Sequence, residues 1–444
     1  MRITSISHPL NAAVRVPGSK SLTNRALLIA ALASGKTKLT NALFSDDSKY
    51  FAQALQELGF DVQLDDTNSE MTVTGLGGRI PAARAELFIG NAGTAARFLS
   101  AFLTLGHGEY VLNGEPRMRE RPIGDLVDAL GQLGCDIQPL QKVESGQQVC
   151  PPVRISASGL KGGKTKIAGD ISSQFLSALL MVAPYAQTPI EIELTTELNS
   201  KPYVDMTIAI MQDFGVEVQR DGYKAFTVPL TSYELQDTQH VIRNSYLVES
   251  DASAASYFFA APAICGGTVK VENISRNSVQ GDIKFLDVLT QMGCTAEETD
   301  HCLLVTGHSE LRGIDVDLRD LPDTAQTLAA IAPFASTPTR IRGIASARHK
   351  ETDRVHATCA ELARLGVQVD EHEDGMTIYP CETLQSATIQ TYNDHRMAMA
   401  FSLIGLRFDG VTIQNPSCVS KTFPNYFEVL DALRVPSPIG RGLG

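Results

Sequence analysis

The sequence predicts an α/β (α+β) protein of two domains, each an inside-out α/β barrel in which three similar helix–strand units are arranged around buried helices. Three observations lead to this fold class. The chain has 444 residues, which is enough for several domains. One pattern of helix and strand recurs six times, about every 75 residues. The first helix of each copy is apolar on nearly every side, which is typical of helices enclosed by other elements.

Each copy has the same order of elements. It opens with small polar or charged residues, continues as an apolar helix, breaks at Gly or Pro, and ends in a short strand. The openings lie near Ser21, Thr94, Ser172, Ala252, Asp323 and Asp394. The six strands read T-K-L-T-N, E-Y-V-L-N-G, P-I-E-I-E-L, T-V-K-V-E-N, T-R-I-R-G and V-T-I-Q-N, and their alternation predicts half-buried strands.

A second helix follows in at least five copies. These helices end in related phrases: E-L-G-F-D-V, Q-L-G-C-D-I, D-F-G-V-E-V, Q-M-G-C-T-A and R-L-G-V-Q-V. The shared Gly predicts a helix C-cap that leads into a strand. Because the period is too long for a typical solenoid repeat, we expect two compact bodies of three copies each. The pattern is weakest at 231–243, before the fourth copy.

Composition argues against several functional classes. The net charge of −12 disfavours general binding to nucleic acid or to a membrane surface. The 8 cysteines contain no C-x-x-C pair, so they predict neither a zinc site nor a disulfide framework. The first residues lack the pattern of a signal peptide, and the apolar stretches are far shorter than the ~20 residues of a membrane span. We therefore expect a soluble, cytoplasmic protein with reduced thiols.

Three of the polar openings have features of anion-binding sites. The segment 17–25 reads P-G-S-K-S-L-T-N-R and offers hydroxyls, backbone amides and two cations at a helix start. The segment 90–97, G-N-A-G-T-A-A-R, adds glycines that permit close backbone approach to a ligand. Ser172, Ser173 and Gln174 form a third polar opening. The alternative for each is a simple helix N-cap, since these residue types are preferred there.

Cations and acids are concentrated in three further segments. The segment 117–122 reads R-M-R-E-R-P, 348–354 reads R-H-K-E-T-D-R, and 393–396 reads N-D-H-R. Acids placed among cations, such as Asp323 and Glu351, can transfer protons. The alternatives are solvated surface ion pairs for the basic segments, an N-cap for Asp323 and a helix-terminus charge for Glu351.

These motifs, taken together and in order, resemble those of the 5-enolpyruvylshikimate-3-phosphate synthase family. The resemblance covers 17–427 and rests on P-G-S-K-S-L-T-N-R, G-N-A-G-T-A-A-R, P-R-M-R-E-R-P-I-G-D-L, G-D-I-S-S-Q-F, E-S-D-A-S-A-A-S-Y, L-P-D-T, K-E-T-D-R, N-D-H-R-M-A-M and S-K-T-F-P-N-Y-F. It implies an N-terminal body of 21–243 and a C-terminal body of 1–20 plus 244–444, with the active site in the cleft between them. We expect the substrates to draw the two bodies together, because their binding residues come from both.

The resemblance also implies the activity: transfer of the enolpyruvyl group of phosphoenolpyruvate to the 5-hydroxyl of shikimate 3-phosphate, with release of phosphate. It implies no cofactor and no metal, a monomer, no nucleic acid and no membrane as partner. The catalytic residues would be Lys20, Asp323 and Glu351. Shikimate 3-phosphate would contact Lys20, Ser21, Arg25, Ser172, Ser173, Gln174, Ser200, Tyr203, Asp323, Ser346 and Lys350. Phosphoenolpyruvate would contact Lys20, Gly93, Arg121, Gln174, Arg354, Arg396 and Lys421.

Two positions depart from common patterns of the family. Ser346 stands where many members have Asn, and Phe98 follows Arg97 where many have Pro. The second departure bears on inhibition by glyphosate. Two other functions remain open: enolpyruvyl transfer to UDP-N-acetylglucosamine, and binding of phosphosugars without catalysis. Members of the sister family usually carry K-N and a loop cysteine, whereas here Lys20 precedes Ser21 and 117–121 has no Cys.

Overall fold

The computed structural model describes residues 1–141, 148–236, 238–242, 245–299 and 302–435. The chain divides into two compact units, which we call the N-terminal unit (Gly18–Glu249) and the C-terminal unit (Met1–Pro17 with Ser250–Gly444). The chain crosses from one unit to the other at Pro17/Gly18 and at Glu249/Ser250, whereas the expected crossings were at 20/21 and 243/244. Lys20 and the segment 245–249 therefore belong to the N-terminal unit and not, as expected, to the C-terminal one.

Six buried helices begin within a few residues of the predicted openings. They are α1 (Lys20–Leu32), α3 (Gly93–Phe102), α5 (Ser173–Val182), α7 (Ala252–Cys265), α9 (Ala325–Ile331) and α11 (His395–Arg407). In α1, every residue from Leu22 to Leu32 is buried. The predicted strands follow as β2 (Ser34–Thr40), β6 (His107–Asn113), β10 (Ile190–Leu194), β15 (Gly267–Glu272), β19 (Thr339–Arg342) and β23 (Val411–Ile413).

A second helix follows each of these strands. These helices are α2 (Asp46–Glu57), α4 (Gly124–Gln132), α6 (Lys201–Asp213), α8 (Phe285–Gln291), α10 (Arg354–Arg364) and α12 (Tyr426–Ala432). The predicted C-cap glycines Gly59, Gly134, Gly215, Gly293 and Gly366 all have positive φ, between 78° and 107°. Glycine reaches this region without the steric cost of a Cβ atom, which explains why the phrase recurs.

Each of five copies forms one mixed sheet. The strand after the glycine is β3 (Asp61–Asp65), β7 (Asp136–Pro139), β11 (Gln219–Asp221), β16 (Thr295–Thr299) or β20 (Val369–His372). It pairs antiparallel with β4 (Glu70–Leu76), β8 (Val153–Ser158), β12 (Ala225–Val228), β17 (Cys302–Gly307) or β21 (Gly375–Ile378), which in turn pairs antiparallel with the first strand of the copy. The sixth copy has a two-stranded sheet of β22 (Ala387–Ile389) and β23.

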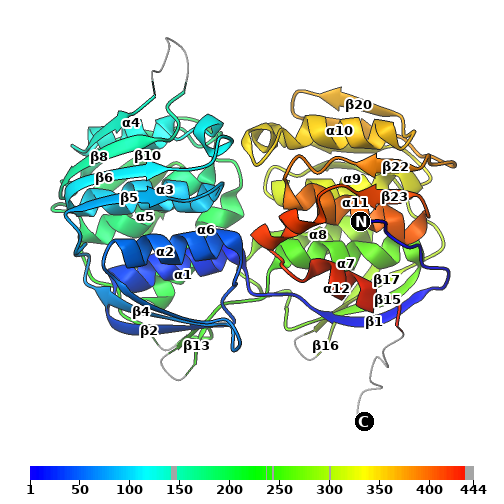
Figure 1. Cartoon of the computed structure of the whole chain (residues 1–444), viewed down its shortest axis with the longest axis horizontal. Helices are drawn as coiled ribbons and strands as arrows, with labels where there is room; N and C mark the ends of the chain where they lie inside the picture. The colour runs from blue at the N-terminus through cyan, green and yellow to red at the C-terminus, as the bar shows by residue number, and fades with distance from the viewer. Residues whose placement is uncertain (142–147, 237, 243–244, 300–301, 436–444) are drawn as a thin grey trace. The chain divides into compact units, whose positions relative to one another are not determined.

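A parallel strand completes the other side of each of these five sheets, and two of these strands pair with a copy other than the one that follows them in the chain. β5 (Arg84–Phe88), β9 (Gly163–Ile167) and β18 (Asp315–Asp317) pair with the first strand of the copy that they precede. In contrast, β1 (Leu10–Arg15) precedes α1 but pairs with β15, with Leu10 opposite Gly267. β14 (Ser245–Leu247), flanked by β13 (Val241–Ile242), precedes α7 but pairs with β2. Figure 1 shows the blue β1 beside β15.

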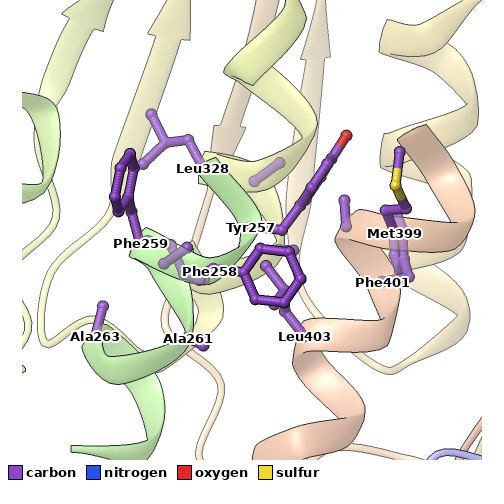
Figure 2. Close-up of a cluster of buried hydrophobic side chains, with 14 of the residues drawn as sticks. Tyr257, Phe258, Phe259, Ala261, Ala263, Leu328, Met399, Phe401 and Leu403 are labelled. Atoms are coloured by element: carbon purple, nitrogen blue, oxygen red, sulfur yellow. The ribbon is translucent and has the colours of Figure 1, made fainter. Parts of the chain in front are cut away.

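The core of the C-terminal unit is built from its three central helices. Figure 2 shows Phe258 and Phe259 of α7, Leu328 of α9 and Leu403 of α11 in one cluster, and all four are fully buried. Burying such side chains contributes roughly 1.5–3 kcal/mol each, so these helices hold the polar residues at their N-termini firmly. Over the residues that the structure describes, no helix combines the length and apolar character that crossing a bilayer requires.

Candidate functional site

A buried ion cluster in the C-terminal unit is centred on Arg354, the first residue of α10. Its guanidinium donates to three carboxylates: Nη1 lies 3.0 Å from Asp323 Oδ1, Nη2 lies 2.7 Å from Glu351 Oε2, and Nε lies 2.8 Å from Asp394 Oδ2. The exposed fraction is 3% for Arg354, 7% for Glu351 and 0% for Asp394. We call these four residues and Arg396 the Arg354 cluster.

Arg396 is the second cation of the cluster. Its Nη2 lies 2.6 Å from Asp323 Oδ2, so one carboxylate bridges both arginines. Its Nη1 donates to the hydroxyl oxygen of Tyr257 at 3.4 Å. Burial raises the pKa of Tyr257 to about 12, although Arg396 acts in the opposite direction. Figure 2 shows this hydroxyl at the margin of the apolar cluster.

The carboxylates of the cluster favour the charged form of Arg354. Burial alone would lower the pKa of Arg354, but the nearby carboxylates of Asp394, Glu351 and Asp323 raise it above its ordinary value. Breaking such a buried pair is costly, because the remaining charge cannot return to water. Two guanidinium groups and three carboxylates are therefore held close together in the C-terminal unit.

The side chains of the Arg354 cluster are positioned at or near the starts of helices. Asp394 is the N-cap of α11 and accepts from the backbone amide of Arg396 at 2.9 Å. Asp353 is the N-cap of α10 and accepts from the amide of His356 at 3.0 Å. Asp323 lies within a 3-10 turn, η5 (Pro322–Thr324), and caps neither η5 nor α9. The N-cap alternative for Asp323 is thus wrong, because its carboxylate faces the two arginines.

Three further predicted residues lie on turns of the same unit. Ser346 belongs to the 3-10 turn η7 (Ala345–His349), which packs against η5 and α10, and Lys350 follows that turn directly. Lys421 ends η8 (Pro416–Lys421), which packs against α11. Ser346 and Lys421 are both buried. The turns that carry these residues therefore pack on the elements that carry the Arg354 cluster.

In the N-terminal unit, Lys20 opens α1. Ser19 is the N-cap and accepts from the amide of Leu22 at 3.4 Å. The ammonium of Lys20 lies 3.6 Å from Asp47 Oδ2 of α2, and the side chains are 12% and 3% exposed. This ion pair holds the ammonium group of Lys20 in place beside α2.

Arg25 lies one turn further along α1 and is 1% exposed. Within the described part of the chain, its guanidinium donates to neutral oxygens: the hydroxyls of Thr207 and Ser177 and the carbonyls of Ser21 and Tyr203. It also lies over the ring of Phe98, with Cζ 5.2 Å from the centroid. Burial lowers the pKa of Arg25 to about 10. Arg25 thus joins α1, α3, α5 and α6.

Four other predicted residues of this unit lie at the starts of α5 and α6. Ser172 is the N-cap of α5 and accepts from the amide of Gln174, whose side chain donates to Thr94 Oγ1 at 3.3 Å. Ser173 is buried at the first position of α5. Ser200 precedes α6 in the left-handed region, with φ 57°. The starts of α3 and α5 are therefore in direct contact.

Gly93 begins α3 in a confined space. A Cβ atom at this position would lie 2.3 Å from Arg121 Nη2 and 2.7 Å from Arg97 Nη1. Arg121 is held from the other side, because its Nη1 donates to the carbonyl and side-chain oxygens of Asn91 at 2.9 and 3.1 Å. Arg97 donates to the carbonyl of Gly93 at 3.0 Å. Any side chain at position 93 must therefore displace an arginine.

Sequence reasoning missed several partners of these residues. Asp394 accepts two hydrogen bonds from Arg354 and is central to the Arg354 cluster. Its position in N-D-H-R, directly before an apolar helix, could have marked it as a site residue. Asp47 beside Lys20, and Thr207 and Ser177 beside Arg25, come from other helices. No local pattern marks these three residues, because their roles depend on how helices pack.

Comparisons with known proteins agree over nearly the whole chain. A family described as EPSP synthase (3-phosphoshikimate 1-carboxyvinyltransferase) matches residues 4–430. The chain is 48% identical over 425 residues to a 3-phosphoshikimate 1-carboxyvinyltransferase of Shewanella halifaxensis, covering 96% of this chain and 97% of the relative. The enzyme of the same name from Sulfurovum sp. is 50% identical over 422 residues, with coverage of 95% and 96%. A solved EPSP synthase of Acinetobacter baumannii superposes with a TM-score of 0.77 at 26% identity, covering 97% of each chain.

Proposed function

The chain belongs to the EPSP synthase family, and we propose that the Arg354 cluster and the polar helix starts around Lys20, Gly93 and Ser172 form its substrate site. The enzyme transfers the enolpyruvyl group of phosphoenolpyruvate to the 5-hydroxyl of shikimate 3-phosphate and releases phosphate. The assignment of the acid and the base rests on one observation: the guanidinium of Arg354 donates hydrogen bonds to both Asp323 and Glu351.

The reaction needs one acid and one base. The methylene carbon of phosphoenolpyruvate gains a proton, the adjacent carbon becomes electrophilic, and the 5-hydroxyl loses its proton as its oxygen attacks. The tetrahedral adduct then loses a proton from the new methyl group and expels phosphate through cleavage of the C–O bond. We assign the base at the hydroxyl to Asp323, the acid at the methylene to Glu351, and stabilisation of developing charge to Lys20.

The pairing of Glu351 with Arg354 bears on when the acid can act. Arg354 Nη2 lies 2.7 Å from Glu351 Oε2, so the proposed acid is bound to a cation in the free enzyme. Phosphoenolpyruvate is itself an anion, and arginine binds carboxylate and phosphate groups in the same forked geometry. We infer that the bound substrate takes over part of the contact that Arg354 makes with Glu351, which leaves the carboxyl group of Glu351 available to the reacting carbon.

The proposed substrate contacts come from residues of both units. Shikimate 3-phosphate would contact Lys20, Ser21, Arg25, Ser172, Ser173, Gln174, Ser200, Tyr203, Asp323, Ser346 and Lys350. Phosphoenolpyruvate would contact Lys20, Gly93, Arg121, Gln174, Arg354, Arg396 and Lys421. The buried polar starts of the helices and the concentrated cations support both lists. For Arg25, the hydroxyl and carbonyl partners already present support a packing role in addition.

Two substitutions test the catalytic assignment. We expect Asp323→Asn and Glu351→Gln each to lower kcat at least a hundredfold, because one positioned acid or base contributes 10²–10⁴-fold. The measurement is phosphate release from phosphoenolpyruvate with shikimate 3-phosphate, and in parallel with UDP-N-acetylglucosamine, on which no turnover is expected. Asp315→Asn, which removes an exposed partner of Arg342, is the control and should leave kcat unchanged. A kcat within threefold of wild type for Asp323→Asn or Glu351→Gln would remove that residue from the mechanism.

The finer parts of the proposal concern the state of the enzyme. We propose that it acts in the cytoplasm as a monomer, without a metal or cofactor and without nucleic acid as a partner. Light scattering at working concentration measures the mass in solution. Activity after extensive dialysis against a chelator should equal that before dialysis, and a loss that Mg²⁺ or Zn²⁺ restores would contradict the metal-free mechanism.

A further inference from the structure

Arg348 joins the segment that carries Lys350 and Glu351 to a neighbouring β-hairpin. Arg348 lies in η7, two residues before Lys350, and its side chain is 22% exposed. It makes hydrogen bonds through three nitrogens. Nη1 lies 2.9 Å from Asp353 Oδ2 and 2.8 Å from Glu371 Oε1, while Nε and Nη2 donate to backbone carbonyls at 3.0 and 2.7 Å.

The two carbonyls belong to Glu373 and His372, at the turn between β20 and β21. This hairpin is part of the sheet that contains β19, so it is a rigid support. Glu371 is itself held by His356 of α10, with Nδ1 3.0 Å from Oε2. Burial acts to raise the pKa of Glu371, but the bonds from Arg348 and His356 outweigh it and lower that pKa.

Asp353, the remaining hydrogen-bond acceptor of Arg348, links Arg348 to the Arg354 cluster. Asp353 uses Oδ1 to cap α10 and Oδ2 to accept from Arg348. The residue after this cap is Arg354, which binds Glu351. The loop 349–353 is therefore fixed at both ends by one planar guanidinium, and Glu351 lies at the middle of that loop.

We propose that Arg348 is a positioning residue for the enolpyruvyl transfer, acting through Glu351; this inference rests on the proposed role of Glu351. Arg348 holds the loop so that the carboxyl group of Glu351 stays at the distance that proton transfer requires. Its partly exposed ion pairs contribute little to stability, as is usual for such pairs. Their effect is on geometry, and a misplacement of about 1 Å in a reacting group can cost about a hundredfold in rate.

A double-mutant cycle tests the proposal. The variants are Arg348→Gln, Glu351→Gln and both together, measured by steady-state phosphate release and by thermal unfolding. We expect Arg348→Gln to lower kcat at least tenfold in the wild-type background but less than threefold in the Glu351→Gln background. Arg340→Gln is the matched control: its side chain is 24% exposed and pairs with Asp374 of the same hairpin, but it does not touch the loop. It should leave kcat within twofold.

The outcomes separate the two proposals. Equal losses of kcat in both backgrounds, or a kcat for Arg348→Gln within threefold of wild type, would overturn the positioning role. If Glu351→Gln itself retains kcat, the catalytic assignment fails instead. Should Arg348→Gln not fold, Asp353→Asn replaces it in the cycle, because Asn still caps α10 while Arg348 loses its charged partner in the loop and keeps Glu371. We expect Asp353→Asn to lower kcat at least threefold, and a loss that persists undiminished beside Glu351→Gln would contradict the proposal.

Discussion

Each unit buries an arginine in its polar site, but the two arginines have opposite surroundings. Arg354 of the C-terminal unit is held by three carboxylates, whereas Arg25 of the N-terminal unit is held by hydroxyls and carbonyls. Accordingly, the pKa of Arg354 is raised and that of Arg25 is lowered to about 10 by burial. Burial opposes the charge in both cases, so the partners decide the outcome.

The difference suggests a division of labour. In the proposed mechanism, an anionic substrate takes over part of the contact of Arg354, and Asp323 and Glu351 then accept or donate protons. Neutral oxygens around a cation do not titrate, so they fix its position without adding a proton-transfer group. The C-terminal unit thus contains the candidate acid and base, and the N-terminal unit contributes fixed polar contacts. This comparison makes the following predictions, from the largest expected effect to the smallest.

Removal of the two arginines should have unequal effects on stability. Arg354→Met leaves three carboxylates buried with one fewer cation, and breaking a buried pair in this way costs about 3–5 kcal/mol. Arg25→Met leaves neutral acceptors, which cost about 1–3 kcal/mol when unsatisfied. Urea unfolding followed by circular dichroism measures both, with Arg2→Met, which removes an exposed ion pair, as the control. An equal or larger loss for Arg25→Met would contradict the comparison.

The sequence predicts much of the architecture behind this comparison. The apolar first helices and the five C-cap glycines were recognisable because both are local patterns that recur. The exchange of β1 and β14 was not recognisable from the residues, since both are short strands whose partners lie far along the chain. The same holds for Asp47 and Thr207, which resemble any polar residue of a helix until packing brings them to Lys20 and Arg25.

Lys20→Met should nearly abolish turnover while leaving the fold intact. Loss of one preorganised charge donor raises the barrier by about 3–4 kcal/mol, which is several hundredfold in kcat. Lys38→Met is the control, because Lys38 forms an ion pair with Glu70 on a more exposed part of the same unit. Steady-state kinetics and thermal melts on both variants check the prediction. A Lys20→Met enzyme within threefold of wild-type activity would exclude Lys20 from the site.

Gly93→Ala should weaken inhibition by glyphosate much more than it weakens use of phosphoenolpyruvate. Family resemblance implies that glyphosate competes with this substrate, and the new Cβ atom would meet Arg121 Nη2 at 2.3 Å. We therefore expect displacement of Arg121 and less space at the start of α3. The measurement is the inhibition constant beside KM for phosphoenolpyruvate, with Gly131→Ala as control, since a Cβ there meets nothing within 4 Å. An unchanged inhibition constant would remove Gly93 from the site.

The smallest effect concerns His240, which belongs to a charged cluster of the N-terminal unit. His240 lies between two carboxylates, with Nδ1 2.8 Å from Asp213 and Nε2 3.1 Å from Glu249, and it packs against Tyr246. Burial alone would lower the pKa of His240, but the hydrogen bonds and charges of the two acids raise it to about 9, above its ordinary value of 6.5. Because the pKa of His240 is higher in the folded state than in the unfolded state, the stabilisation is fully present below pH 6.5 and is lost as the pH rises through 9.

We therefore expect the melting temperature of the wild type to fall between pH 6.5 and 9 and that of His240→Gln to fall less. Melts across this range, with the exposed His356→Gln as control, provide the measurement. Parallel curves for wild type and His240→Gln would show that the proton on His240 does not stabilise this unit.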